Sequence, residues 1–155
     1  VWLRNQDLEI RARAPVFDVE HFDLYQHYQR GRHPGGGMDE ADPQKYLEFL
    51  TGRHVVTAFY EMRLNSRLLG VAVVDRLPDG LSAVYTFFDP GQRARALGIY
   101  AVLWQIEEAR RRQLPYVYLG YWIGDSLKMS YKTSYRPLEA YQGGFWGLLN
   151  CGQEK

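Results

Sequence analysis

The feature that most constrains the fold of this chain is a crossover, in which a turn, a long helix and a short strand follow in direct succession. Asp89-Pro90-Gly91 ends the strand before it, since proline lacks a ladder donor. The helix runs to about Gln113 and is apolar nearly all round from Ala96 to Ile106, which predicts a buried first half. Tyr116 to Tyr121 then forms a short buried strand. A strand–helix–strand succession predicts a parallel pair.

An antiparallel meander is expected before the crossover. Three apolar, β-branched runs predict strands at Val55 to Arg63, Leu68 to Asp75 and Leu81 to Phe88. Asn65-Ser66 and Pro78-Asp79-Gly80 supply the tight turns between them. Connections this short join neighbouring antiparallel strands.

The remaining elements complete an α+β pattern. They are a strand at Leu8 to Ala14, a helix from the Asp18 cap to about Tyr28, a helix from Asp42-Pro43 to about Leu50, a helix at Ser126 to Tyr135 capped by Asp125, and a hairpin at Leu138 to Leu149 around Gly143-Gly144. We expect one domain over residues 1–155, with a mixed, mostly antiparallel sheet flanked by helices. This order matches GNAT-type acyltransferases, whose sheet splays open near its centre.

Composition sets the broad class. At 155 residues and 46% hydrophobic, the chain is large enough for a globular core. Its one cysteine, Cys151, excludes an internal disulfide and a cysteine-based metal cluster, which favours a reducing compartment such as the cytoplasm. No apolar run reaches the roughly 18 residues of a membrane helix, and the start lacks a signal-peptide pattern. Since the chain begins with Val1, we expect a fragment or a processed product.

Charge points to an anionic partner. Between Gly91 and Arg136 there are eight Lys and Arg and three Asp and Glu, a charge of +5 in a chain whose total is +1. The exposed end of the long helix, Arg110-Arg111-Arg112, contributes at most a diffuse attraction for RNA. The glycine-rich run Arg30 to Met38 is a loop that either binds phosphate or covers a substrate. The four histidines show no metal-ligand spacing and are expected on the surface or in loops: His21, His27, His33 and His54.

The start of the long helix tests for coenzyme A. Acetyl-CoA enzymes place two small residues there, so that backbone N–H groups can hold a pyrophosphate. Here Gly98 fills the first small position, but Tyr100 fills the second, and its ring is expected to obstruct the pyrophosphate. The helix end, with Arg93 and Arg95, still suits a phosphate of another shape.

Long stretches of the chain resemble one family. They are SAVYTFFDP (Ser82 to Pro90), ALGIYAVLWQIEEAR (Ala96 to Arg110), LPYVYLGYWI (Leu114 to Ile123) and KMSYKTSYRPLE (Lys128 to Glu139), together with RHPGGGM and NQDLEIRAR. They resemble the carboxy-terminal half of arginyl-tRNA–protein transferases, and more narrowly the bacterial aspartate/glutamate leucyltransferase branch. The resemblance implies a GNAT-like fold and transfer of an amino acid from aminoacyl-tRNA to proteins with N-terminal Asp or Glu, which marks them for N-degron proteolysis. Family members also carry an amino-terminal domain with a cysteine-rich motif, which is not found in these 155 residues, and Cys151 lies outside that motif.

The implied reaction needs little machinery. An aminoacyl-tRNA ester is already activated, so aminolysis requires no ATP, metal or cofactor. The acceptor α-amine has a pKa near 8, and the enzyme must align the reactants, accept a proton and stabilise an oxyanion. Asp75, at a predicted strand end, and Asp89, at the turn before the helix, are the candidate proton acceptors. Their structural alternatives are a turn residue and a helix cap.

Two further groups are candidates for binding substrate or tRNA. Lys128, Tyr131, Lys132 and Tyr135 share a face of the second helix by i, i+3, i+4 spacing, which suits phosphate contacts and base stacking. Tyr118, Gly120, Tyr121 and Trp122 lie at the end of the central strand, where such enzymes seat the acyl group. The alternatives are a solvated basic face and ordinary core packing.

Three other functions remain open at this point. The donor can be Arg-tRNA instead of Leu-tRNA. The enzyme can be an acetyl-CoA-dependent acetyltransferase, against which Tyr100 argues. The chain can also be a non-catalytic module that binds RNA or degrons.

Overall fold

The computed structural model describes residues 1–32, 42–52 and 54–149. Contacts divide the chain into two compact units, Val1–Gly120 and Tyr121–Lys155. We treat each unit by itself, and the single domain expected from the sequence stays a prediction. The glycine-rich loop from residue 33, His33 and Cys151 lie outside the described residues.

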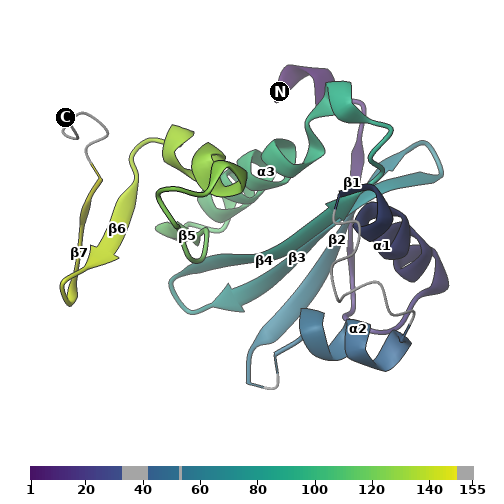
Figure 1. The fold of residues 1–155 in the computed structure, drawn as a ribbon, viewed down its shortest axis with the longest axis horizontal. Helices are drawn as coiled ribbons and strands as arrows, with labels where there is room; N and C mark the ends of the chain where they lie inside the picture. The colour runs from purple at the N-terminus through teal and green to yellow at the C-terminus, as the bar shows by residue number, and fades with distance from the viewer. Residues whose placement is uncertain (33–41, 53, 150–155) are drawn as a thin grey trace. The chain divides into compact units, whose positions relative to one another are not determined.

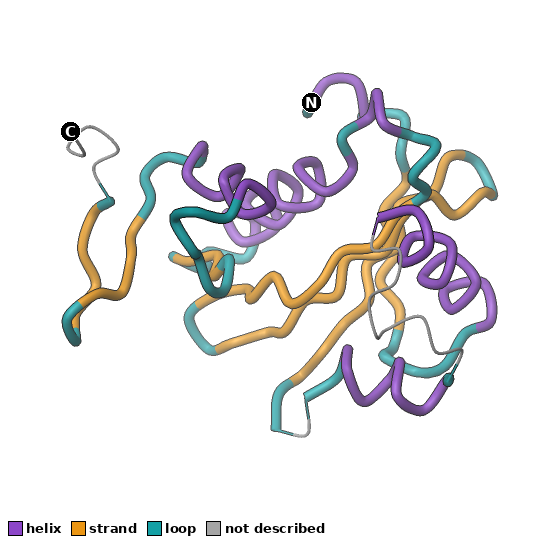
Figure 2. Tube along the Cα trace, viewed as in Figure 1, coloured by secondary structure: helices purple, strands orange, loops and turns teal. Residues whose placement is uncertain are grey.

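The first unit is a five-stranded sheet with helices on both faces (Figures 1 and 2). Its strands are β1 (Glu9–Arg13), β2 (Val56–Leu64), β3 (Arg67–Leu77), β4 (Gly80–Phe88) and β5 (Tyr116–Tyr118). Its α-helices are α1 (Val19–Arg32), α2 (Pro43–Leu50) and α3 (Leu97–Arg111), and its short 3-10 helices are η1 (Leu3–Asn5) and η2 (Arg93–Arg95). The strands follow chain order, and only the β4–β5 pair is parallel. The predicted meander and parallel pair are confirmed.

Local sequence explains where α1 and α2 begin. The Asp18 carboxylate accepts from the backbone N–H of Glu20 at 2.8 Å, and Asp42 accepts from that of Gln44 at 2.9 Å. Both are N-caps that satisfy otherwise unpaired helix donors. Helix α1 extends four residues beyond the predicted end at Tyr28.

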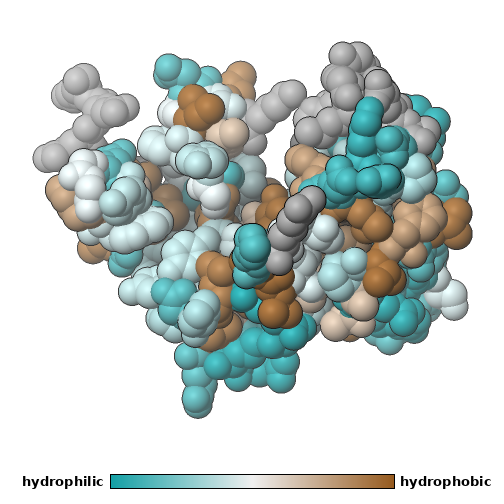
Figure 3. Space-filling model, turned by 90° about the horizontal axis from the view of Figure 1, so that it is seen from below, coloured by the Kyte–Doolittle hydropathy of each residue, from teal (hydrophilic) through white to brown (hydrophobic). Residues whose placement is uncertain are grey.

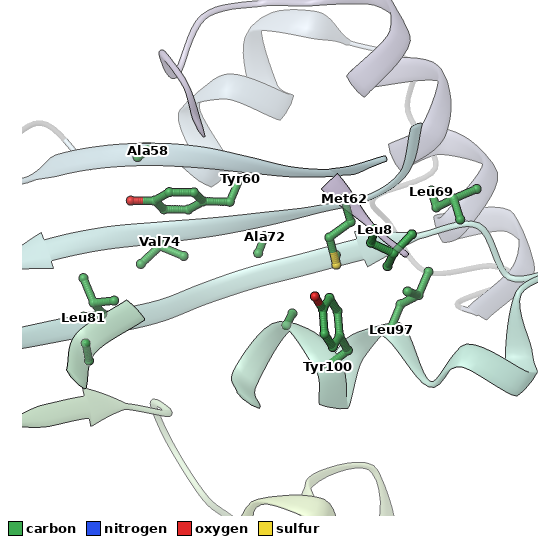
Figure 4. Close-up of a cluster of buried hydrophobic side chains, with 12 residues drawn as sticks. Leu8, Ala58, Tyr60, Met62, Leu69, Ala72, Val74, Leu81, Leu97 and Tyr100 are labelled. Carbon is green, nitrogen blue, oxygen red and sulfur yellow. The ribbon is translucent and has the colours of Figure 1, made fainter. Parts of the chain in front are cut away.

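Each face of the sheet carries its own core. On one face, residues such as Tyr60, Met62 and Val74 pack against α3 (Figure 4). On the other, Phe59 and Phe87 pack beneath the aromatic residues of α1 and α2. The predicted shared face of α1 is confirmed, because its three aromatic positions are all buried: Phe22, Tyr25 and Tyr28. Alternating strand residues therefore supply both cores.

Strands β4 and β5 pair over a short length and then part. Only three pairs join them, the last being Ser82 with Tyr118, whereas β4 continues to Phe88. A β-bulge in the β3–β4 ladder follows directly, between Val73 and Val74. Within the described residues, the second half of β4 thus has no strand on its β5 side. Strand β5 is also less buried than predicted, with Tyr116 45% exposed.

The second unit holds a 3-10 helix, η3 (Leu127–Ser134), and a hairpin of β6 (Glu139–Gln142) and β7 (Phe145–Leu148). The hairpin is confirmed, and its turn uses Gly143 and Gly144 at φ 60° and 92°, values that glycine adopts without strain. The α-helix expected here is instead 3-10, and its N-cap is Ser126, not Asp125. None of the helices in the described ranges has the length and apolar content needed to cross a bilayer.

Candidate functional site

The start of α3 differs from its prediction. Between Gly91 and the helix lies η2, and α3 begins only at Leu97, after Ala96 in a left-handed conformation (φ 51°). Tyr100 is 3% exposed, and its ring points from α3 toward Met62 in the core (Figure 4). The obstruction predicted from this ring is therefore wrong, since the ring lies inside the protein. Gly98 packs closely on Phe88, because a Cβ there would lie 3.3 Å from the Phe88 ring.

Arg95 is held by the N-terminal segment. Its guanidinium makes two hydrogen bonds of 2.8 Å to the carboxylate of Asp7, and this contact lowers the pKa of Asp7. In return, the side chain of Asn5 donates to the carbonyl of Arg95 at 2.9 Å. Arg95 thus ties the N-terminus to the α3 turn, whereas Arg93 is exposed.

Asp89 lies in a cleft between α1 and the ends of two strands. Its Oδ2 accepts from Nη2 of Arg67 at 2.6 Å, and its Oδ1 accepts from the backbone N–H of Gly91 at 2.8 Å. Nε2 of His27 lies 3.8 Å from Oδ1. The expected helix cap is wrong, since α3 starts eight residues later; the carboxylate instead fixes the turn that leaves the sheet.

Asp75 is part of a row across the sheet. Thr57, Asp75, Ser82 and Tyr118 are successive register partners on β2, β3, β4 and β5, so their side chains share one face. The hydroxyl of Thr57 donates to Oδ1 of Asp75 at 2.6 Å. Asp75 is not at a strand end as predicted, because β3 continues to Leu77.

The end of β5 has its own arrangement. The hydroxyl of Tyr118 donates to Oδ2 of Asp79 at 2.9 Å, which links β5 to the β3–β4 turn. Gly120 has a φ of 74°, a backbone conformation that residues other than glycine adopt only with strain. Tyr118 is therefore tied to the β3–β4 turn, and Gly120 holds a backbone conformation that favours glycine.

The second unit holds the other predicted binding residues. Because 3-10 helices have three residues per turn, residues i and i+3 eclipse and residues i and i+4 diverge. The α-helical i, i+3, i+4 spacing behind the predicted face therefore does not apply within η3, and the shared face itself stays a prediction. Nζ of Lys132 donates to the carbonyl of Tyr121 at 2.6 Å, and burial lowers its pKa. The rings of Tyr131 and Tyr135 lie 6.5 Å apart, whereas Tyr121 is 92% exposed and Trp122 is 40% exposed. The side chain of Lys128 lies outside the description.

Several residues of the Asp89 cleft were not predicted. Glu20, Leu24 and His27 line it at i, i+4, i+7 spacing on α1, a pattern visible in the sequence but without a chemical signature. No pattern in the sequence pointed to Arg67 as a functional residue. His21 was predicted at the surface and is instead buried beside Glu61, at 2.7 Å. No cluster of three or more metal-ligating side chains occurs among the described residues.

The surface around these sites is mixed. Seen from below, hydrophobic residues lie in separate patches among hydrophilic ones (Figure 3). Exposed apolar side chains of the first unit include Phe49 and Val56. Single exposed apolar residues are normal on a protein surface and mark no interface by themselves.

Comparison with known proteins gives the context. A protein-family model described as "Arginine-tRNA-protein transferase, C terminus" matches residues 20–142. A protein of Hahella chejuensis named aspartate/glutamate leucyltransferase is 51% identical over 145 residues, covering 94% of this chain and 62% of its own length. A protein of the same name from Nitrosococcus oceani is 52% identical over 149 residues, covering 96% and 63%. The chain thus spans less than two thirds of the length of these relatives.

The family match includes α1, the whole meander, α3, β5 and η3, and therefore both candidate carboxylates and the Asp89 cleft. At this level of coverage and identity, the chain belongs to the arginine-tRNA–protein transferase family and contains its C-terminal domain.

Proposed function

We propose that this protein transfers leucine from Leu-tRNA to proteins whose N-terminal residue is Asp or Glu, and so marks them for degradation through the N-end rule pathway. The observation that carries the proposal is identity of about half of all residues to relatives named aspartate/glutamate leucyltransferase, extending over nearly the whole chain. The name of the matching family, which mentions arginine, keeps Arg-tRNA as the rival donor.

The finer fold that we propose is GNAT-like. Three observations support it: the meander followed by a helix and a parallel strand, the parting of β4 and β5 after Ser82 and Tyr118, and the β-bulge next to that point. Strands that part leave backbone N–H groups without ladder partners. Such donors can stabilise the oxyanion that forms when an amine attacks an ester.

The reaction is aminolysis of the ester that joins leucine to the tRNA. The neutral α-amine of the acceptor attacks the ester carbonyl and forms a C–N bond, the ester C–O bond breaks, and the ribose hydroxyl leaves with a proton. The amine's proton passes to a base. No metal or cofactor enters this balance.

Asp75 and Asp89 are the proposed bases. Asp75 accepts a hydrogen bond from Thr57 and lies two residues before the end of β3. Asp89 is 8% exposed, lies in a cleft beside His27, and directly follows the half of β4 that, among the described residues, has no strand on its β5 side. A concave site with converging polar groups is the stronger setting for catalysis. We therefore favour Asp89, with His27 as its partner.

Charged tRNA is the proposed partner, which places the reaction in the cytoplasm. Arg93, the Arg110-Arg111-Arg112 run and Lys132 provide cations for phosphates. The exposed ring of Tyr121 provides a surface for base stacking.

The test uses the full-length protein with labelled Leu-tRNA or Arg-tRNA and a peptide that begins with Asp. Transfer of leucine and not arginine is expected. Transfer of arginine alone would favour the rival donor. If neither label reaches the peptide, the proposal is wrong; coenzyme A titrated by calorimetry then tests the acetyltransferase alternative.

A further inference from the structure

The Asp89 cleft is a concave site whose lining residues all belong to the first unit. It has a volume of about 290 Å³ and is lined by Glu20, Leu24, His27, Arg67, Leu68 and Asp89. This volume is close to the lower end of the roughly 300–1,000 Å³ of small-ligand sites. Three of the lining residues belong to α1, and the other three lie at the start of β3 and directly after β4. The cleft can therefore take one residue of a ligand.

Arg67 offers a carboxylate site within the cleft. Its side chain is 67% exposed, and within the described residues it makes one hydrogen bond, from Nη2 to Asp89. A guanidinium has five N–H donors in a planar fork, so most of them remain available. This fork matches the two oxygens of a carboxylate.

The opposite charge lies in the same cleft. Asp89 is buried and keeps Oδ1 facing His27 at 3.8 Å. Glu20 is half-exposed, and its Oε2 forms an ion pair with Nη2 of Arg63 at 2.5 Å. An ammonium group placed between these carboxylates has two anionic partners. Leu24 and Leu68 supply apolar contacts for methylene groups.

The cleft thus complements a residue with one ammonium and one side-chain carboxylate. An N-terminal Asp or Glu is such a residue. A leucyl ester carries only the ammonium and would leave Arg67 without a carboxylate, so the donor is the poorer match. Resting on the transferase activity proposed above, we infer that this cleft binds the N-terminal acidic residue of the acceptor protein, with Arg67 contacting its side-chain carboxylate and Asp89 and Glu20 facing its α-ammonium.

The position agrees with the reaction. Asp89 directly follows the half of β4 that has no partner on the β5 side in the described structure. An acceptor amine held at Asp89 therefore lies at the end of β4, the strand whose backbone is proposed to help hold the oxyanion. One carboxylate then both binds the ammonium and receives its proton.

The experiment substitutes Arg67→Gln in the full-length protein and compares peptides that begin with Glu and with Gln. We expect kcat/KM for the Glu peptide to fall about 10- to 100-fold, the range of a hydrogen bond to a charged group. The loss should appear in KM for the peptide, with KM for Leu-tRNA unchanged. Arg67→Lys should recover part of it, and preference for Glu over Gln should shrink in Arg67→Gln.

The matched control is Arg11→Gln, which removes an arginine on β1 whose side chain is 41% exposed and pairs with Glu9 at 2.7 Å. It should keep both kinetic constants. If wild-type protein transfers leucine and Arg67→Gln keeps the preference for Glu over Gln, the acceptor assignment is wrong while the activity stands. If wild-type protein transfers nothing, the proposed function itself fails, and the assignment with it. Thermal unfolding of Arg67→Gln confirms that the variant folds.

Discussion

Nε2 of His21 on α1 lies 2.7 Å from Oε1 of Glu61 on β2, and both side chains are 2% exposed. The second oxygen of Glu61 accepts from Nε of Arg63 at 2.7 Å. Nη2 of Arg63 also donates to Oε2 of Glu20, and Nε of Arg13 lies 3.3 Å from Oε1 of Glu61. A buried charged cluster therefore joins α1 to the sheet, and one of its members, Glu20, also lines the Asp89 cleft.

Glu61→Gln tests how much this cluster contributes to the free energy of unfolding. The amide keeps the shape but leaves the buried Arg63 with a weaker partner, and breaking a buried pair costs about 3 kcal/mol. We expect the unfolding free energy from urea titration to fall by about that amount. Glu9→Gln, which alters an exposed pair with Arg11, should leave the midpoint unchanged. Equal effects of the two substitutions would contradict a structural role for Glu61.

The same cluster makes stability depend on pH. Burial raises the pKa of Glu61, but hydrogen bonds from Arg63 and His21 outweigh it and hold the pKa at about 2, against an ordinary 4.5. A lowered carboxyl pKa adds stability above the unfolded value, and this is lost as pH falls from about 4.5 toward 2. The gap in unfolding free energy between wild type and Glu61→Gln should therefore narrow between pH 5 and pH 3. A constant gap would show that ionisation is irrelevant.

Gly80→Ala tests the short β4–β5 pair. A Cβ at Gly80 would lie 2.7 Å from the carbonyl oxygen of Tyr116, and a backbone atom cannot move aside cheaply. Overpacking of this kind costs about 1–3 kcal/mol, and it should displace β5 with Tyr118. Gly147→Ala is the control, because its Cβ meets nothing within 4 Å. Thermal unfolding and transfer assays should show a loss for Gly80→Ala alone.

Asp75→Asn separates the two proposed bases. The amide oxygen can still accept from Thr57, so the row across the sheet should persist. With the acceptor at Asp89, we expect kcat to stay within about threefold of wild type, whereas removal of a general base costs roughly 10²–10⁴-fold. Asp23→Asn, on the exposed surface of α1, is the control. A loss above a hundredfold in Asp75→Asn would assign the base to Asp75 instead.

Lys132→Ala tests tRNA binding by η3. A cation that neutralises one phosphate contributes about 0.7–0.9 to the slope of log K against log salt. We expect weaker Leu-tRNA binding and a slope smaller by that amount, measured by filter binding at several salt concentrations. Lys45→Ala, on the exposed side of α2, should change neither. An unchanged slope in Lys132→Ala would limit Lys132 to its contact with the carbonyl of Tyr121.

Short-range signals predicted most of the fold. The caps at Asp18 and Asp42, the two hairpin turns of the meander and the Gly143-Gly144 turn depend on neighbours within a few residues, and all are present. Where a local signal admits two geometries, prediction failed. The segment Leu127–Ser134 has helical spacing, but it folds as a 3-10 helix and not as the expected α-helix.

The candidate site depended on contacts between distant residues. Arg95 meets Asp7, His21 meets Glu61, and Asp89 meets Arg67, all from separate elements. The sequence marked Asp89 as a candidate because it follows a strand, but it gave no sign of Arg67. The ring of Tyr100 could point to the helix start or into the core, and packing against Met62 decided it.

By itself, the sequence determined the class of fold, the order of its elements and, through long motifs, the family. Periodicity, caps and turns depend on residues that are close together in the sequence, so they can be recognised before the tertiary structure is known. Tertiary structure alone decided which charges meet, because ion pairs and clefts arise only after the sheet register and helix packing are set. That is why the family could be stated from residues, while the cleft at Asp89 had to be found in space.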